Sequence, residues 1–196
     1  DNTYLILPPI RRPGYYGVLL QDFTCFQEMV ANDFMDLPNP DSAKTMYDVY
    51  KLEFMELPKY KHKVILESAS SFCGWANIDT TIQKELLKNW YDSLISYKGE
   101  NVKHLTEGIV GFCLAYGDVY EQTQSHYWAL KVRYGPYSPY FEPVLIDENE
   151  NVRQVFGKLV SSIQTKQSFD FFDRTFQGFS IPLIRFKKNK IVKFDN

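Results

Sequence analysis

The chain has 196 residues, with 22 Lys and Arg against 24 Asp and Glu, and a formal net charge of −2 at neutral pH. This length is typical of one domain, and so small a net charge gives no overall positive field to attract nucleic acid. Aromatic residues make up 16% of the chain. They predict a strong core, with the alternative that some of them line a binding surface.

Cysteine and histidine are too scattered for a disulfide framework or a metal site. The three cysteines are Cys25, Cys73 and Cys113, and this odd set favours the cytoplasm or another reducing intracellular compartment. No Cys-x-x-Cys or His-x-His spacing occurs, so we expect no metal and no cofactor. No apolar run approaches the roughly 20 residues of a membrane span. We recognise no signal peptide and expect a soluble protein.

Short apolar runs, turn formers and capping patterns divide the first half of the chain. In chain order we expect strands over 4–7 and 15–21, a helix from Phe23, a helix running into a strand over 46–54, a strand over 63–68 and a loop over 68–78. A capping box that begins at Thr80, followed by apolar residues every four positions, predicts a helix that ends before Gly99.

An antiparallel meander over 109–147 is the predicted centre of the fold. Residues 109–116 form a continuous apolar run with glycines around it, which favours a buried strand. Residues 126–134 alternate between apolar and polar, and 141–147 are aromatic and β-branched, so both are predicted strands. A three-stranded meander follows if neighbouring segments pair.

The segment after the meander predicts a helix that covers the sheet. Apolar residues recur at helical spacing over 152–163, after turn formers at 147–151. Residues 181–186 and 190–194 then form a predicted terminal hairpin. The whole pattern predicts a single α+β domain over residues 1–196, with a largely antiparallel sheet and about three packed helices.

A cysteine, a histidine and two polar turn residues are the best candidates for catalysis. Cys73 precedes a predicted helix, whose N-terminal dipole would favour a thiolate. His126 opens a predicted strand, and an imidazole within hydrogen-bond reach of a thiol takes up its proton. Asp147 or Asn149, at the end of the neighbouring strand, would orient the ring. The alternative is that Cys73 is a small buried residue and His126 a turn residue.

The segments Cys73-Gly74-Trp75 and His126 through Tyr134-Gly135 resemble, in their order, papain-like and NlpC-like cysteine hydrolases. The resemblance implies a hydrolase that acts on an amide or ester. Cys73 would be the nucleophile and His126 the general base and then acid. The other two histidines, His62 and His104, stand in charged stretches and are expected at the surface.

The loop over 134–140, with the sequence YGPYSPY, is the best candidate for recognition of a partner. Its prolines restrict the backbone, and rigid tyrosines supply contact area at a small entropic cost. We expect Tyr134, Tyr137 and Tyr140 to contact another protein. The alternative is a loop that folds back on its own sheet.

The predicted terminal hairpin is basic. It carries five basic residues and no acidic one between them, and phenylalanines alternate with the charges. Such a hairpin could hold phosphates and stack bases, whereas lysines on an edge strand also guard against aggregation. The basic residues are Arg185, Lys187, Lys188, Lys190 and Lys193.

Three functions follow from these features, in order of preference. The first is a module that binds another protein and, in one form of this function, inhibits or neutralises it. It ranks first because recognisable catalytic groups are scarce. The second is a cysteine hydrolase that uses Cys73 and His126. The third is nucleic-acid binding through the basic hairpin.

Overall fold

The computed structural model describes residues 4–6, 18–20, 46–75, 84–99, 101–134, 139–186 and 189–194. The chain divides into two compact units, residues 1–45 and 46–196. In the first unit, the two predicted strands are present as β1 (Tyr4–Ile6) and β2 (Val18–Leu20), and these two pair antiparallel. The helix expected from Phe23 lies outside the described residues. One domain over residues 1–196 stays a prediction.

The second unit combines helices with one antiparallel sheet, which confirms the α+β class. Its helices are α2 (Met46–Val49), α3 (Lys51–Met55), α4 (Leu57–Cys73), α5 (Lys84–Ser96), α6 (Val102–Thr123), α7 (Val155–Gln164), α8 (Phe169–Gly178) and the 3-10 helix η1 (Leu183–Phe186). Its strands are β3 (Tyr127–Tyr134), β4 (Pro139–Ile146), β5 (Asn151–Arg153), β6 (Ile181–Pro182) and β7 (Asn189–Lys193), in the order β6-β5-β4-β3-β7.

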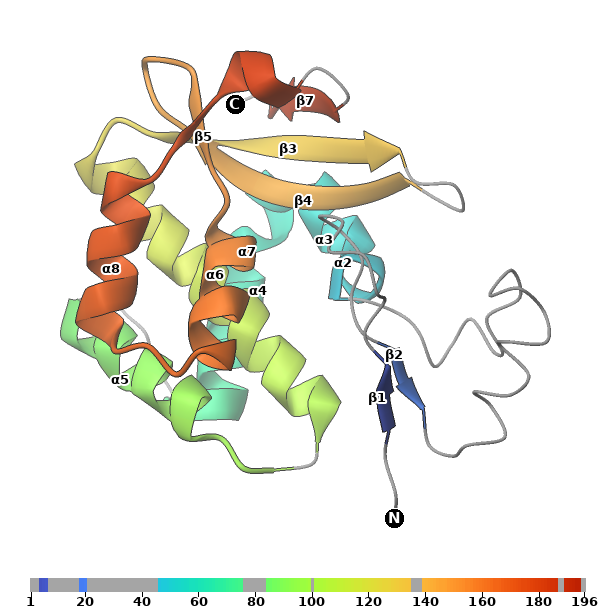
Figure 1. Ribbon diagram of the computed structural model, residues 1–196, viewed down its shortest axis with the longest axis vertical. Coiled ribbons are helices and arrows are strands. Elements are labelled where there is room, and N and C mark those ends of the chain that lie inside the picture. Colours follow the sequence, from blue (N-terminus) through green and yellow to red (C-terminus); the bar gives the residue numbers. More distant parts are fainter. Residues whose placement is uncertain are drawn as a thin grey trace. The chain divides into compact units, whose positions relative to one another are not determined.

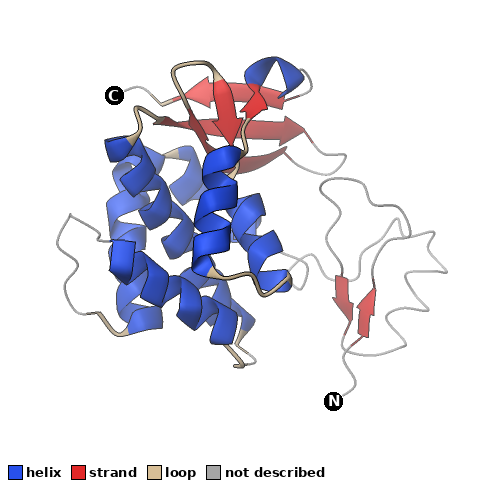
Figure 2. Ribbon diagram, turned by 60° about the vertical axis from the view of Figure 1, so that its left-hand side comes forward, coloured by secondary structure: helices blue, strands red, loops and turns tan. Residues whose placement is uncertain are grey.

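The sheet lies as a layer across one end of the helices (Figures 1 and 2). Seven α-helices are described, against the three or so predicted. No helix in the described part is both long and apolar enough to cross a membrane. The predicted helix after Thr80 is confirmed from Lys84 onward as α5. The predicted helix over 152–163 begins only at Val155, because Val152 belongs to β5 and pairs with Ile146 of β4.

Two predicted strands are helices. Residues 63–68 lie inside α4, which continues to Cys73 through the first half of the predicted loop 68–78. The predicted strand within 46–54 is also helical, as α2 and α3. Pro58 stands in the first turn of α4, where the missing N–H of proline costs no hydrogen bond. Residues 46–54 alternate as in a strand and 64–66 form a short apolar run, and over so few residues both patterns also fit a helix.

The predicted strand over 109–116 lies in the middle of α6, the longest described helix. Its residues are apolar in sequence because α6 is buried on all sides, which removes the helical periodicity. The glycines allow close packing: a Cβ atom at Gly108 would lie 2.6 Å from the ring of Phe72 in α4. The first strand of the predicted three-stranded meander is therefore part of a helix.

The two central strands are confirmed. β3 and β4 pair antiparallel from Tyr127↔Ile146 to Tyr134↔Pro139. One face packs on the helices through Trp128, Leu130, Val132 and Leu145. The outer face holds a smaller apolar cluster, against which Leu183 and Phe186 of η1 and Ile191 of the neighbouring strand β7 pack.

The prediction of a terminal hairpin is wrong. β6 pairs with β5, and β7 pairs with β3, so the two segments join opposite edges of the sheet. Residues 183–186, which were expected to continue the first strand of that hairpin, form η1 instead.

Candidate functional site

Cys73 lies at the end of a helix that disfavours a reactive thiol. It is the last residue of α4 and precedes Gly74, whose φ of 72° ends the helix. A helix C-terminus carries the negative end of the helix dipole, which opposes a thiolate. Burial raises the pKa of the Cys73 thiol to about 12. The thiol is therefore protonated at neutral pH.

His126 has both ring nitrogens bound by neighbouring groups. Nδ1 lies 2.7 Å from the carbonyl oxygen of Gln124, and Nε2 lies 3.0 Å from Nε of Arg153. Because a carbonyl only accepts and a guanidinium only donates, Nδ1 carries the proton and Nε2 accepts. Burial, with a smaller effect of the Arg153 charge, lowers the pKa of His126. The ring also lies edge-on to Tyr120.

The structure does not bring Cys73 and His126 together. Helices α4 and α6 run antiparallel: Phe72 packs on the start of α6, whereas Lys61 near the start of α4 pairs with Asp118 near the end of α6 at 2.6 Å. Cys73 stands at one end of this helix pair and His126 follows the other. At about 1.5 Å per residue, α6 separates them by roughly 20 Å.

Asp147 shapes the turn between β4 and β5. Its Oδ1 accepts the backbone N–H groups of Asn149 and Asn151, each at 2.9 Å. Burial alone would raise the pKa of the Asp147 carboxyl, but these hydrogen bonds outweigh it and hold the pKa below its ordinary value. Within the described residues, neither Asp147 nor Asn149 is hydrogen-bonded to His126. The groups that orient the imidazole are Gln124 and Arg153.

A serine, a histidine and a glutamate meet where α4 ends and α6 begins. Ser71 Oγ lies 3.5 Å from Nδ1 of His104 and 3.4 Å from a carboxylate oxygen of Glu107. Both distances are long for a hydroxyl hydrogen bond, and the carboxylate contacts the serine instead of the imidazole. These contacts do not form the relay of a hydrolase triad.

The predicted tyrosine loop is described only in part. Tyr137 lies outside the described residues, and so does the side chain of Tyr134. Tyr140, at the start of β4, is half-buried, with its ring centroid 5.2 Å from that of Tyr47 in α2. The end of the loop is therefore packed against α2.

Three large apolar side chains are exposed in a row on α2 and α3. Val49, Leu52 and Met55 are 53%, 53% and 44% exposed. Their spacing of three residues places them along one side, while Tyr47 and Phe54 face the core. We call Val49, Leu52 and Met55 the apolar stripe. The sequence pattern did not reveal this stripe, because part of the segment was expected to be a strand.

The predicted basic residues lie at two places on the sheet. Nζ of Lys193 lies 4.9 Å from the ring centroid of Tyr127, as a cation–π contact on the outer face. The exposed basic residues are Arg185 in η1 and Lys190 and Lys193 in β7, whereas Lys187 and Lys188 lie outside the described residues.

A cavity of about 500 Å³ opens beside the C-terminal end of β7. Its apolar walls are Leu57 and Pro58 at the start of α4, with Trp128 and Phe194 from the sheet. This volume is in the range of sites that hold a small molecule or a large side chain. We call it the β7 cavity.

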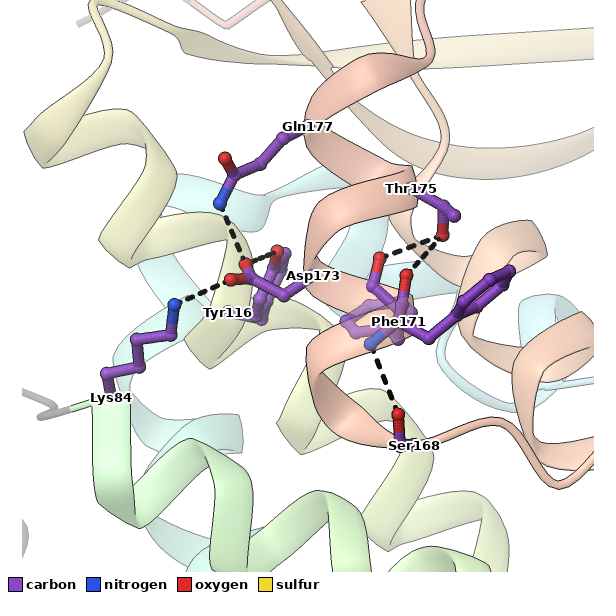
Figure 3. Close-up of polar contacts among 8 residues, drawn as sticks. Lys84, Tyr116, Ser168, Phe171, Asp173, Thr175 and Gln177 are labelled. Atoms are coloured by element: carbon purple, nitrogen blue, oxygen red, sulfur yellow. Dashed lines mark hydrogen bonds and ion pairs between the residues drawn. The ribbon is translucent and has the colours of Figure 1, made fainter.

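A buried carboxylate joins three helices (Figure 3). Asp173 in α8 accepts from the Tyr116 hydroxyl of α6 at 2.7 Å and from the Lys84 ammonium of α5 at 2.6 Å. Gln177 adds a third bond at 3.1 Å. Burial alone would raise the pKa of Asp173, but these bonds outweigh it and lower that pKa. The sequence held a signal for this buried carboxylate, since Asp173 lies among Phe169, Phe172 and Phe176, the phenylalanines on the buried face of α8.

An ion pair is buried on the outer face of the sheet. Lys131 in β3 pairs with Glu142 in β4, and their side chains are 5% and 3% exposed. The Gln154 amide lies 3.3 Å from Glu142, and the Phe186 ring covers the ammonium of Lys131. The opposite charges satisfy each other, as buried charges must.

Within the described residues, no group of three or more His, Cys, Asp or Glu side chains could hold a metal ion. Comparison of the chain with protein families, with curated proteins and with solved structures finds no match in any of the three.

Proposed function

We propose that the chain is a protein-binding module whose contact surface combines the apolar stripe with the neighbouring tyrosine loop. The apolar stripe is the observation that carries this proposal. Exposed apolar residues are ordinarily scattered, and a contiguous set of large ones marks an interaction site. Inhibition or neutralisation of the partner is one form that such binding takes.

The position of the stripe supports its use together with the loop. Tyr47 in α2 packs on Tyr140, and Lys51 in α3 lies 5.4 Å from the ring centroid of Phe141. Both contacts fix α2 and α3 beside the first residues of β4, which the loop enters. Charged residues flank the stripe, including Lys51 and Glu56, as in the polar rim of a typical interface.

A reducing intracellular compartment, such as the cytoplasm, is part of this proposal, because Cys73 and Cys113 are both free thiols. The geometry gives no comparable support to the hydrolase, since Cys73 and His126 stand at opposite ends of a helix pair. Nucleic-acid binding lacks the support of a hairpin, since, of the basic residues that the structure describes there, Lys190 and Lys193 belong to β7 and Arg185 to η1.

A pull-down from source cells with matched variants tests the surface. The triple variant Val49→Gln, Leu52→Gln and Met55→Gln keeps helix-forming residues on an exposed surface, so it is expected to fold and to lose the partner. The control is Val102→Gln with Ile184→Gln, which removes two apolar residues that are 70% and 72% exposed elsewhere. Retention of the partner by the triple variant, or its loss from both variants, counts against this surface.

The loop is tested separately. The double variant Tyr137→Ala and Tyr140→Ala is expected to weaken binding of the same partner. Its thermal unfolding is measured alongside, because Tyr140 packs on Tyr47. A double variant that stays folded and binds with unchanged affinity removes the loop from the contact surface.

A further inference from the structure

β7 is an open edge of the five-stranded sheet. It pairs with β3 from Ala129↔Lys193 to Arg133↔Asn189 and ends the order of the described strands. In an antiparallel strand, backbone N–H and C=O groups point alternately to the two sides, so half of those in β7 point away from β3. The opposite edge, β6, has two residues, and one of them is Pro182, which has no N–H. β7 is the better edge for addition of a strand.

Each face of β7 carries an exposed lysine. Lys193 lies on the outer face with Ile191, and Lys190 lies on the helix side with Val192. The strand contains no acidic residue. Like charges oppose pairing of β7 with a second copy of itself, and they favour an acidic strand as the partner.

The β7 cavity offers a place for an apolar side chain of such a strand. Phe194 follows β7 and packs on the helix side, where it lines the cavity with Leu57 and Pro58. Val192, on the same side, is 37% exposed. Side chains of an added strand alternate as those of β7 do, so every second one points to the helix side. One of them near Phe194 reaches the cavity.

We propose that β7 binds an extended acidic segment of a partner protein as an added β-strand, with an apolar side chain of that segment in the β7 cavity. Backbone hydrogen bonds supply affinity in this mode of recognition, and the alternate side chains supply specificity. The surface contains no residue of the apolar stripe, so this inference goes beyond the proposed function.

The β7 cavity suits a peptide better than single-stranded nucleic acid. Base stacking needs an exposed ring face, and Trp128 is 5% exposed. The ammonium of Lys61 is already held by Asp118 at 2.6 Å and by Glu121 at 2.9 Å. The Glu121 carboxylate also lines the cavity, so an apolar side chain suits this cavity better than a phosphate or a carboxylate does. The two lysines of β7 remain as the cationic groups, and an acidic strand matches their spacing.

Display of random short peptides against the full chain tests the proposal. We expect enrichment of peptides with two acidic residues three positions apart, one for each lysine of β7, and an apolar residue on the helix side near Phe194. Lys190→Glu with Lys193→Glu is expected to lower the affinity of the best peptide by about tenfold or more. The control, Lys98→Glu with Arg174→Glu, changes the net charge equally at two exposed positions and is expected to leave the affinity within about twofold.

Backbone methylation of the best peptide distinguishes strand addition from other modes. N-methyl groups on one alternate set of amides are expected to abolish binding, and on the other set to be tolerated, because only one set faces β7. Equal tolerance of both patterns overturns the proposal. So does the absence of enrichment, enrichment of basic or uncharged peptides, or tighter binding of oligothymidylate than of the best peptide.

The apolar-stripe variant separates this test from that of the proposed function. Because β7 shares no residue with Val49, Leu52 and Met55, their replacement by Gln is expected to leave the affinity of the peptide unchanged. Loss of peptide binding in that variant would overturn the assignment to β7. Failure of the pull-down alone would affect only the proposed function.

Discussion

Arg153 donates its Nε–H to Nε2 of His126 at 3.0 Å. The same guanidinium donates through Nη1 to three carbonyl oxygens at the end of α8, those of Phe176, Gln177 and Phe179. Carbonyls at a helix C-terminus lack the amide donors of the helix interior, although that of Phe176 also accepts from the N–H of Phe179 at 3.4 Å, and a positive charge there is favoured by the helix dipole. His126 thus helps to hold Arg153 at the end of α8. Only the neutral form of His126 can accept the hydrogen bond from Arg153.

We predict that stability falls as the pH drops below about 6.5, the ordinary pKa of histidine. The pKa of His126 is lower in the folded chain, so the unfolded chain takes up the proton first. The stability that His126 contributes is complete above the unfolded pKa and declines as the pH falls towards the lower folded one. Urea unfolding measured from neutral pH down to about pH 5 records this decline.

The variant His126→Gln is the control for that decline, because its side chain does not titrate. Its free energy of unfolding is expected to depend less on pH in this window, although it is lower at neutral pH. Hydrogen bonds lower the pKa values of Asp147 and Asp173 from that of an ordinary Asp carboxyl, so the stability that depends on these two groups is lost below this pH window. An unchanged pH dependence in the variant would contradict the assignment to His126.

The Asp173 cluster predicts unequal effects for its two charged partners. Asp173→Ala is expected to cost about 3 kcal/mol, because it leaves the Tyr116 hydroxyl buried without its acceptor. Lys84→Ala is expected to cost less than about 1 kcal/mol, since the side chain of Lys84 is 67% exposed. Urea unfolding of both variants at neutral pH measures the difference. Equal losses would mean that the ammonium, and not the hydroxyl, dominates the cluster.

The candidate catalytic pair, Cys73 and His126, shows that the order of two residues in the sequence does not determine their distance in the fold. The strand that His126 precedes was correctly predicted, because apolar and polar residues alternate along it. Gly74 was a signal that Cys73 ends a helix, since glycine is favoured just after a helix, but the small residues before it fit a loop and a packed helix alike. The separation of the two side chains depends on the antiparallel arrangement of α4 and α6, which is a tertiary property.

We predict that Cys73 is a slow nucleophile. Its pKa of about 12, against 9.0 for a free thiol, lowers the thiolate fraction at neutral pH about a thousandfold. The greater nucleophilicity of a more basic thiolate offsets roughly half of this on a logarithmic scale. Alkylation by iodoacetamide, read by mass spectrometry, is expected to be about 30-fold slower than for a cysteine peptide.

The comparison that decides this prediction is His126→Ala. We expect it to leave the alkylation rate of Cys73 unchanged, because the imidazole stands at the far end of the helix pair. A rate equal to or above that of the peptide, lowered by His126→Ala, would restore the hydrolase hypothesis.

The glycines of α6 explain the largest error in the predicted fold. In the sequence they surround an apolar run and favour a strand, because glycine is costly inside a helix. In the structure, Gly111 and Gly117 are the points at which Ser68 and Trp128 contact the backbone of α6. The energy of that contact comes from residues distant in sequence, so local patterns do not contain it.

A pair of glycine substitutions measures this packing directly. Gly117→Ala would place a methyl group against the ring of Trp128, whose indole N–H is held by Asp118 at 3.2 Å. Because that ring is buried and fixed, we expect a loss of about 2 kcal/mol. Gly157→Ala, in the exposed face of α7, meets no atom within 4 Å and is expected to gain about 0.5–1 kcal/mol from helix propensity. Urea unfolding of both variants, with Trp fluorescence as the probe, should give shifts of opposite sign. Stabilisation by both would show that Trp128 can move away, and that the glycine is not required for the contact between α6 and β3.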